Sequence, residues 1–435
     1  MKQYNSYKDS GVKWLGEIPS HWEAVPLKKC FSESETGLWG EEPLNDGYDS
    51  ICIRVADFDY GKGIINNKKL TPRHYSFLPT KKKLQKGDLL LEKSGGGDIY
   101  PVGRVVRYNL EDLDATCSNF IQKLRTCSSV NSCYLFYLFF SMYSKKVNGL
   151  YFNQTTGIQN LKIKEFLSQI VFLPNFDEQK AIANYLDAVT SKIDEAIAQQ
   201  QKMIELLNER KQIIINNAVT KGLDPNVKMK PSGIDWIGDI PEHWNVRRGK
   251  YLFRIVNELS NTGDEELLTV SDKTGITPRS MKNVTMFMAE SLVGYKKCKI
   301  GDICSNIMWM WHGAVGVTKY NGVISPSYGV YRQRSCYFVD EFLDKLLRLP
   351  QLVKLYTALS TGLTESRLRL YPNDFMNISF YVPPIYEQKA ILSYLERYIT
   401  PIDNAIQSAT KQISLLQERK QIIINDVVTG KVKVV

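Results

Sequence analysis

The octapeptide ERKQIIIN occurs twice in this chain, at Glu209–Asn216 and again at Glu418–Asn425. Eight identical residues in a row, 209 positions apart (418 − 209), indicate an internal duplication, because a match of this length is not expected by chance. The similarity extends without gaps over residues 173–220 and 382–429. Each octapeptide therefore belongs to a long repeated block.

A second, shorter repeated block lies upstream of each long block. SGVKWLGEIPSHW at 10–22 matches SGIDWIGDIPEHW at 232–244, with an offset of 222. The two offsets differ by 13 residues, so the segments between the blocks, 24–172 and 246–380, have unequal lengths, and they share little visible similarity. The chain thus contains two variable regions, each framed by constant segments.

The long block has the apolar spacing of a long helix. Its narrow stripe of apolar residues, stepping by threes and fours, is typical of a coiled-coil seam. The two helices can bury their stripes by packing on each other, and the alternative is that they are separate core helices of two domains. Asn175 and Glu178 predict a capping box at the start of the first copy, and Pro384 fits the first turn of the second. The seam residues are Ile182, Leu186, Val189, Ile193, Ile197, Ile204, Leu207 and Ile214, and in the second copy Ile391, Leu395, Tyr398, Ile402, Ile406, Ile413, Leu416 and Ile423.

The variable regions are expected to be mixed α/β domains. Short β-rich runs such as SICIRVADF (50–58) and EELLTVSD (265–272) alternate with turn residues. The most apolar run, Tyr134–Tyr143, is about half as long as a membrane span and predicts a buried helix. The sequence therefore predicts an α+β fold with a pseudo-twofold internal repeat, in which a pair of long antiparallel coiled-coil helices separates two domains. The expected ranges are 1–172 and 224–381 for the domains, and 173–223 and 382–435 for the helices.

The composition favours a polyanionic partner. Lys and Arg number 56 against 46 Asp and Glu, which gives a formal net charge of +10. The eight cysteines form no C-x-x-C pair, as expected for reduced thiols in a cytoplasmic protein. Only four histidines are present, and no P-loop, H-E-x-x-H or G-x-S-x-G motif occurs. We therefore expect no metal site and no cofactor in this chain.

One short motif resembles a catalytic site. The EQK of Glu178–Lys180 and Glu387–Lys389 is similar to the E-x-K of metal-dependent nucleases. That motif needs a strand and a further acidic residue to hold Mg²⁺. Here both copies stand at a helix start, where acidic residues interact favourably with the helix dipole. We expect no catalytic residue.

Basic clusters in both variable regions are candidates for contacts to phosphates and bases of DNA. For any one of these residues, a solvated charged face is the alternative. Base readout is expected in the loops 93–104 and 309–316. The DNA-binding candidates are Lys81, Lys82, Lys83, Lys93, Arg104 and Arg107 in the first region, and Lys296, Lys297, Trp309, His312, Arg332, Arg334, Arg367 and Arg369 in the second.

With GEIPSHW and GDIPEHW, and with LPNFDEQKAIANYLD and VPPIYEQKAILSYLE, the whole chain resembles the specificity subunit of type I restriction-modification systems. The resemblance implies two target recognition domains, each reading one half of a bipartite site in double-stranded DNA. It implies that the helices set the spacer and dock two methyltransferase (modification) subunits, which bind S-adenosylmethionine and through which restriction (translocase/nuclease) subunits join. This subunit would be noncatalytic and cytoplasmic, with no membrane contact. A metal-dependent nuclease and a stand-alone DNA-binding adaptor are the alternatives.

Overall fold

The chain folds into two compact units in a computed structural model that describes residues 3–45, 47–111, 113–155, 157–282, 289–364 and 367–434. Unit 1 comprises Met1–Lys202 together with Ala409–Val435, and unit 2 comprises Met203–Ser408. Two long helices, α3 (Phe176–Lys221) and α8 (Ile385–Val428), contribute one half each to both units. The predicted α+β fold with two mixed domains and a pair of long helices is confirmed.

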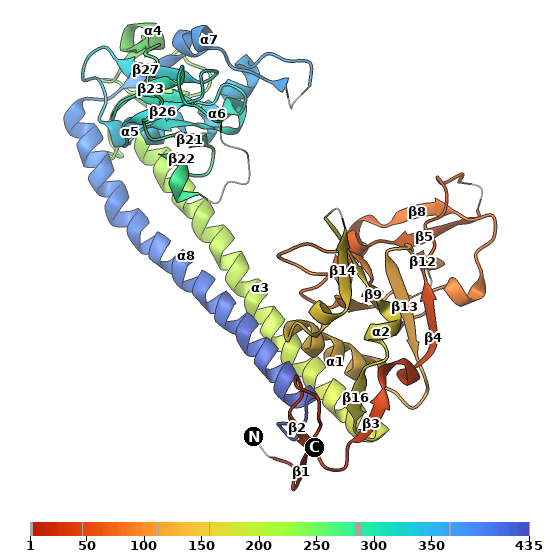
Figure 1. Cartoon of the computed structure of the whole chain (residues 1–435). Helices are drawn as coiled ribbons and strands as arrows, with labels where there is room; N and C mark the ends of the chain where they lie inside the picture. The colour runs from red at the N-terminus through yellow and green to blue at the C-terminus, as the bar shows by residue number, and fades with distance from the viewer. Residues whose placement is uncertain are drawn as a thin grey trace. The chain divides into compact units, whose positions relative to one another are not determined.

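Unit 1 contains a six-stranded sheet in the order β4-β13-β9-β11-β7-β6 (Figure 1). β9 lies inside this sheet, paired antiparallel with β13 and β11. Its residues Leu89, Leu90 and Leu91 are all fully buried, so both faces of the sheet are covered at this strand. The strands are β4 (Phe31–Thr36), β6 (Phe58–Asp59), β7 (Ile64–Ile65), β9 (Leu89–Glu92), β11 (Val105–Arg107) and β13 (Ile121–Thr126).

Unit 1 also contains three smaller sheets besides the N-terminal hairpin, which is described below. β5 pairs with β12 and β8, β15 pairs with β10 and β14, and β3 pairs with β16. The predicted strand within 50–58 is confirmed as β5. The bounds are β3 (Glu23–Pro26), β5 (Asp49–Ile53), β8 (Thr71–His74), β10 (Ser94–Gly95), β12 (Ala115–Cys117), β14 (Phe152–Thr155), β15 (Ile158–Leu161) and β16 (Ile170–Leu173).

The apolar run at 134–143 forms helix α1 (Ser132–Ser144), as predicted. The side chain of Asn131 caps it by accepting a hydrogen bond from the backbone N–H of Tyr134 at 3.0 Å. α1 packs in one apolar cluster with Leu186 of α3 and Val427 of α8. The ends of the two long helices are therefore part of the core of unit 1, which also contains the short helix α2 (Ile163–Phe166).

Unit 2 is built on a four-stranded antiparallel sheet in the order β20-β27-β24-β25 (Figure 1). Its apolar cluster includes Val219 of α3 and Leu395 of α8, so here too both long helices enter the core. The predicted strand within 265–272 is confirmed as β21. The strands are β19 (Asn245–Arg248), β20 (Phe253–Ile255), β21 (Leu268–Ser271), β22 (Gly275–Pro278), β23 (Lys296–Cys298), β24 (Ile303–Ser305), β25 (Val315–Val317), β26 (Gly322–Ile324), β27 (Gly329–Gln333) and β28 (Ser379–Val382), and the short helices are α4 (Gly249–Leu252), α5 (Asp340–Leu347), α6 (Pro350–Leu359) and α7 (Pro372–Asn377).

The two long helices run antiparallel in each unit. In unit 1, Lys420 Nζ of α8 lies 2.7 Å from Asp194 Oδ1 of α3. In unit 2, Lys211 Nζ of α3 lies 2.6 Å from Asp403 Oδ1 of α8. Residue numbers rise from 194 to 211 along α3 while those of the partners fall from 420 to 403 along α8. The antiparallel pairing predicted from the stripes is therefore present.

The seam is deeply buried only where the helices meet a domain core. Of the sixteen predicted seam residues, six are less than a tenth exposed and nine are partly buried. Tyr398 was wrongly expected in the stripe: it is 45% exposed, and Ile399 is buried in its place. Tyr398 instead packs against Tyr394 one turn earlier. The buried six are Ile182, Leu186, Ile193, Ile391, Leu395 and Ile402, and the partly buried nine are Val189, Ile197, Ile204, Leu207, Ile214, Ile406, Ile413, Leu416 and Ile423.

The short repeated block forms the same hairpin in both units. β1 (Tyr7–Asp9) pairs with β2 (Glu17–Pro19), and β17 (Met229–Pro231) pairs with β18 (Asp239–Pro241). The tryptophan that follows each hairpin, Trp22 or Trp244, is almost completely buried. Each hairpin closes over the end of a long helix.

Glycine is required where the chain turns away at the end of a long helix. Gly430, just after α8, has φ of +76°, and a Cβ there would lie 2.3 Å from Pro19 Cδ. Gly222, just after α3, has φ of +75° and lies against Trp244. Positive φ and close approach both favour glycine. Each glycine lets the helix end beneath the hairpin.

Candidate nucleic-acid interface

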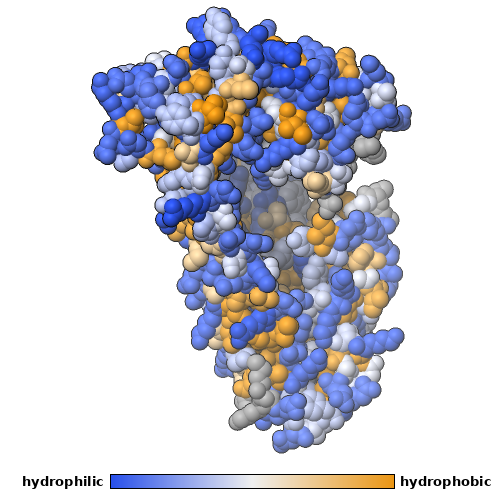
Figure 2. Space-filling model, turned by 90° about the vertical axis from the view of Figure 1, so that its left-hand side faces the viewer, coloured by the Kyte–Doolittle hydropathy of each residue, from blue (hydrophilic) through white to orange (hydrophobic). Residues whose placement is uncertain are grey.

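Hydrophilic residues predominate on the face shown in Figure 2, with apolar residues in groups among them.

The cluster Lys81–Lys83 lies at the 3₁₀ turn Thr80–Lys82 of unit 1. Each of its ammonium groups has a partner: Lys81 faces Glu35 at 3.6 Å, Lys82 donates to the carbonyl of Thr36 at 2.6 Å, and Lys83 lies 2.8 Å from Asp114. Lys81 and Lys83 remain more than two-fifths exposed, so their cations are also accessible to solvent.

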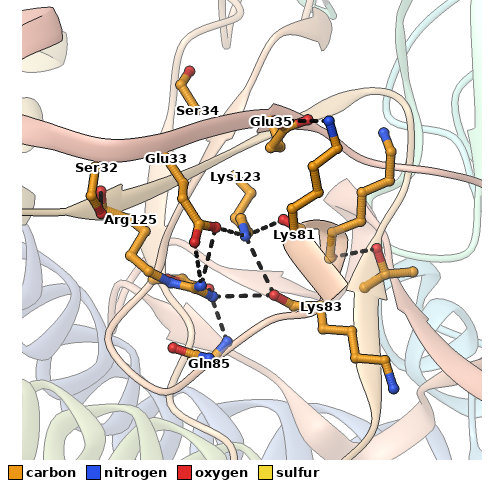
Figure 3. A network of polar contacts seen from close by, with 12 residues as sticks. Ser32, Glu33, Ser34, Glu35, Lys81, Lys83, Gln85, Lys123 and Arg125 are labelled. Carbon is orange, nitrogen blue, oxygen red and sulfur yellow. Dashed lines mark hydrogen bonds and ion pairs between the residues drawn. The ribbon is translucent and has the colours of Figure 1, made fainter. Parts of the chain in front are cut away.

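A buried lysine holds the backbone of this turn by hydrogen bonds (Figure 3). Lys123, 1% exposed, donates to Glu33 at 2.6 Å and to the carbonyl oxygen of Lys81. Arg125 bonds the same Glu33 and also donates to the carbonyl oxygen of Lys83. The hydrogen bond from Lys123 is the main cause that lowers the pKa of Glu33. The backbone of the Lys81–Lys83 turn is thus fixed, while its side chains face outward.

The arginines beside the first predicted reading loop have structural partners. Arg104 donates through Nε at 2.8 Å and Nη2 at 3.0 Å to the fully buried carboxylate of Glu92. Arg107 lies against α3, with Nη1 3.0 Å from Asp187. Lys93 donates to Thr36 Oγ1 at 3.1 Å, and its burial lowers its pKa. Of these candidates, Arg104 lies beside a cavity, and Arg107 links strand β11 to helix α3.

A cavity of about 720 Å³, which we call the aromatic cavity, opens beside the loop 93–104 in unit 1. Trp39, Tyr100 and Phe120 line it and remain 38%, 63% and 48% exposed. These aromatic residues could not be grouped from the sequence, because they come from three separate segments and only the fold brings them together. Exposed aromatic side chains of this kind are the ones on which nucleobases stack.

The second predicted reading loop presents a stack of rings. Trp309 and Trp311 have centroids 6.1 Å apart with an interplanar angle of 15°, and His312 lies 4.1 Å from Trp311. Trp309 is 55% exposed. The structure therefore brings both candidates of this loop, Trp309 and His312, together at the surface of unit 2.

The basic candidates of unit 2 fall into two groups. Most are engaged: Lys296 donates to the carbonyl of Tyr328, Lys297 pairs with Glu265 at 2.8 Å, Arg332 pairs with Asp302 and Glu258, and Arg334 donates to the carbonyls of Lys250 and Phe253. Within the described part of the chain, the guanidinium groups of Arg367 and Arg369 have no such partner. Of the predicted candidates in this unit, Arg367 and Arg369 are therefore the cations with most freedom to contact a phosphate.

The EQK motif holds the hairpins and is not arranged as a metal site. Glu178 accepts hydrogen bonds from Tyr4 Oη at 2.7 Å and Trp22 Nε1 at 3.3 Å, and it pairs with His21 at 2.9 Å. Glu387 accepts from Trp244 Nε1 at 2.8 Å and pairs with His243. Among the described residues, no group of three or more His, Cys, Asp and Glu could hold a metal ion.

The predicted capping box is only half formed. Asn175 Oδ1 accepts from the N–H of Glu178 at 2.9 Å, as expected. The carboxylate of Glu178 turns to the hairpin instead of the Asn175 backbone. The neighbouring Gln179 and Gln388 are both buried. Gln179 accepts a hydrogen bond from the backbone N–H of Asn131, just before α1, and Gln388 accepts one from that of Val339, just before α5. The repeated motif therefore joins hairpin, long helix and domain helix.

Residues 41–206 and 237–414 match the model of the type I restriction modification DNA specificity domain, once in each repeat. The two matches cover more than half of the chain. The chain belongs to this family. The MjaVIII specificity subunit, from the type I restriction enzyme of Methanocaldococcus jannaschii, is 28% identical over 98% of this chain and 97% of its own length. The putative type I restriction enzyme MjaX specificity subunit of the same organism is 25% identical over 98% of each chain.

A solved structure from work on the assembly and conformational transition of the type I R-M system has the same fold. Its TM-score to this chain is 0.66 at 15% sequence identity, and the match covers 95% of this chain and 99% of that one. In the part of the DNA specificity protein that the structure describes, no helix has the length and apolarity needed to cross a membrane.

Proposed function

We propose that this protein is the DNA-recognition subunit of a type I restriction-modification complex, in which each unit reads one half of a bipartite site in double-stranded DNA. The observation on which this rests is that the DNA specificity domain occurs twice, on one repeated scaffold. The surfaces on the two copies differ: unit 1 has the aromatic cavity and unit 2 has the stack at Trp309. Two similar domains with different surfaces are what recognition of a site with two different halves requires.

The constant parts of the chain are the proposed docking surface for the partners. Because the two helices are copies that share about half of their residues, they can offer similar surfaces to two methyltransferase subunits, with S-adenosylmethionine bound in those subunits. Restriction subunits would join through them. The recognition domains are proposed as 1–172 and 224–381, with the conserved helices as 173–223 and 382–435. In this proposal the chain is noncatalytic and acts in the cytoplasm.

A nuclease role has less support. The carboxylates that an E-x-K site would use, Glu178 and Glu387, are already bonded to tryptophan and histidine side chains of the hairpins. These contacts explain why an acidic residue is present at both positions without any catalysis.

The proposal is tested by expressing the protein with its methyltransferase and sequencing the methylome of the cells. We expect one bipartite methylated motif, and replacement of residues 24–172 with the corresponding region of a relative should alter one half of that motif only. Binding of the purified complex to DNA should fall steeply with salt, because Lys and Arg displace condensed counterions. A simultaneous change of both halves, or binding that ignores salt, would contradict the proposal.

A further inference from the structure

The aromatic cavity has the construction of a ligand site. It lies entirely within unit 1, and its volume of about 720 Å³ is in the range of small-molecule sites in proteins. Large apolar side chains gathered in the open at one place mark an interaction surface. Beyond the three aromatic residues named above, Ile99 also lines the cavity and is 83% exposed.

The two arginines of the cavity are each paired with a carboxylate, and Asp98, which also lines the cavity, adds a negative charge. Arg54 is neutralised by Asp57, to which it donates through Nε at 3.3 Å and Nη2 at 2.8 Å. Arg104 is neutralised by the buried Glu92 in the same way. Among the residues that the structure describes, neither Nη1 atom has a hydrogen-bond partner. The cavity therefore offers donors without an excess positive charge.

Ser118, which also lines the cavity, has an unsatisfied hydroxyl group. The residue is 2% exposed, and its Oγ has no hydrogen-bond partner within the described parts of the chain. A buried polar atom without a partner is destabilising unless a bound group satisfies it. The hydroxyl is a further polar group at the wall of the cavity, beside the donors of the two arginines.

The loop at the cavity mouth is shaped by glycine. Gly96 has φ of +64°, and a Cβ there would lie 2.5 Å from the backbone nitrogen of Val102. The next residue, Gly97, has no atom within 4 Å of its Cβ position and also lines the cavity. The backbone at Gly97 is therefore open to an occupant.

These features select a neutral, planar ring with hydrogen-bond acceptors. A phosphate would need an unpaired cation, whereas a nucleobase stacks on aromatic side chains and accepts hydrogen bonds from arginine, as guanine does. A base inside an intact duplex is stacked on both faces, so it must leave the stack before it can lie on these aromatic side chains. We propose that the aromatic cavity holds one unstacked nucleobase of the half-site that unit 1 reads. This inference rests on the proposed function, since it takes DNA as the source of the base.

The variant Gly97→Phe tests the inference by placing a large side chain at the lining of the cavity. The position has space for a side chain and no positive φ, so the fold should be kept. Gly149→Phe is the matched control, because Gly149 also has free space at Cβ, lies in unit 1 and is exposed, but does not line the cavity. Equal unfolding transitions of the three proteins establish that the comparison is fair.

The readout is the fluorescence of 2-aminopurine placed in turn at every position of the half-site, with the assembled complex. For the natural protein and Gly149→Phe, we expect a several-fold rise at one position besides the base to be methylated, which the methyltransferase extrudes itself. Gly97→Phe should lose the rise at this additional position and bind the specific site about tenfold more weakly, the loss expected for one good base contact. A rise at the additional position that persists in Gly97→Phe arises elsewhere in the complex and overturns the inference.

A mismatch opposite the extruded base gives a second readout. Because a mismatched base is easier to extrude, the mismatch should tighten binding of the natural protein and leave Gly97→Phe unchanged. Specific binding and methylation with no brightened position other than the methylated base would disprove the inference and leave the proposed function intact. Absence of any specific binding would instead disprove the proposed function itself. Guanosine that binds the DNA-free complex, and no longer binds Gly97→Phe, would show that a free nucleoside occupies the cavity and would overturn the assignment to DNA.

Discussion

Lys123 is an ammonium group in the interior of unit 1, and its surroundings explain how the protein accommodates it. Its bonds to Glu33 and to the carbonyl of Lys81 replace the water that it loses on burial. Removing one partner of a buried ion pair leaves an uncompensated charge, which is more costly than losing an exposed pair. The adjacent carboxylate on the same strand, Glu35, provides an internal comparison: it is about as exposed as Glu33 (29% against 33%), but its partner Lys81 is 64% exposed.

We predict that Glu33→Gln destabilises the protein by about 3 kcal/mol, because Lys123 keeps its charge without a carboxylate. Glu35→Gln should cost about 0–1 kcal/mol, as expected for an exposed pair. Urea denaturation of the two variants, followed by circular dichroism, measures both values. Equal losses would show that the burial of Lys123 is not what makes Glu33 important.

Glu265 in unit 2 is expected to stay ionised in acid. Hydrogen bonds from Lys297 and Ser260 lower the pKa of Glu265 to about 2. Because the folded pKa lies below the unfolded one, this carboxylate stabilises the fold above the ordinary glutamate range, and the stabilisation disappears as the pH falls from there toward 2.

Carbon-detected NMR of the side-chain carboxylates should give a midpoint near 2 for Glu265. In Lys297→Met the midpoint should rise toward the ordinary value. Lys299→Met provides the control, since Lys299 faces Glu258 at 3.8 Å instead. A midpoint that does not respond to Lys297→Met would contradict the assignment of its main cause.

At the scale of single residues, candidate DNA-binding residues could be predicted by their type, but their hydrogen-bond partners could not. Arg104 was a sound candidate by type and by its place near a glycine loop. Its bond to Glu92 could not be foreseen, because strand register brings the two residues together. The same holds for Ser118, whose orphaned hydroxyl is visible only once burial is known.

The repeated octapeptide has a reciprocal role in the helix pair. Its lysine in the first copy, Lys211, pairs with Asp403, and its lysine in the second copy, Lys420, pairs with Asp194. The two aspartates are themselves equivalent positions of the repeat. Each helix thus donates the same cation to the same acid of the other, which explains why both copies retain these residues.

The two pairs should differ in strength. Lys420 is 13% exposed and also donates to the carbonyl of Gly61, whereas Lys211 is 30% exposed. Double-mutant cycles with Lys→Met and Asp→Asn should give a coupling of about 1 kcal/mol for Lys420 with Asp194 and about 0.3 kcal/mol for Lys211 with Asp403. A larger coupling in unit 2 would contradict the effect of burial.

The long helices were the most predictable elements, since an apolar stripe over many turns leaves few alternatives. Their ends were less so, and Ile399 took the place of Tyr398 where α8 enters the core of unit 2. The strands were predictable only as short β-rich runs. Their order, such as β13 between β4 and β9, depends on contacts far apart in the sequence.

At the scale of the whole molecule, the helices are proposed to set the spacing of the two half-sites. An insertion must spare both cores, and Val219 near the end of α3 is buried in unit 2. Four helix-forming residues after Lys202 together with four after Ser408 lie at the boundaries between the units and leave both lysine–aspartate pairs intact. Each helix would lengthen by about 6 Å at about 1.5 Å per residue.

We predict that the methylated motif of this double insertion keeps both half-sequences and gains one or two base pairs of spacer, since each base pair adds about 3.4 Å. Methylome sequencing measures the spacer. Insertion in α3 alone is the control and should abolish methylation, because the helix pair loses its register. A fully active double insertion with an unchanged spacer would refute this role of the helices.

The division of the helices between the units also bears on synthesis at the ribosome. Unit 2 is one continuous stretch and has all its residues once Ser408 is made. Unit 1 needs Val427 and Val428, which pack with Leu186 although they are made about 240 residues later. At about 5–20 residues per second, that delay is roughly 10–50 s. The half of the protein that is translated first is therefore completed last, and its uncovered apolar surface makes the nascent chain a client for chaperones throughout that interval.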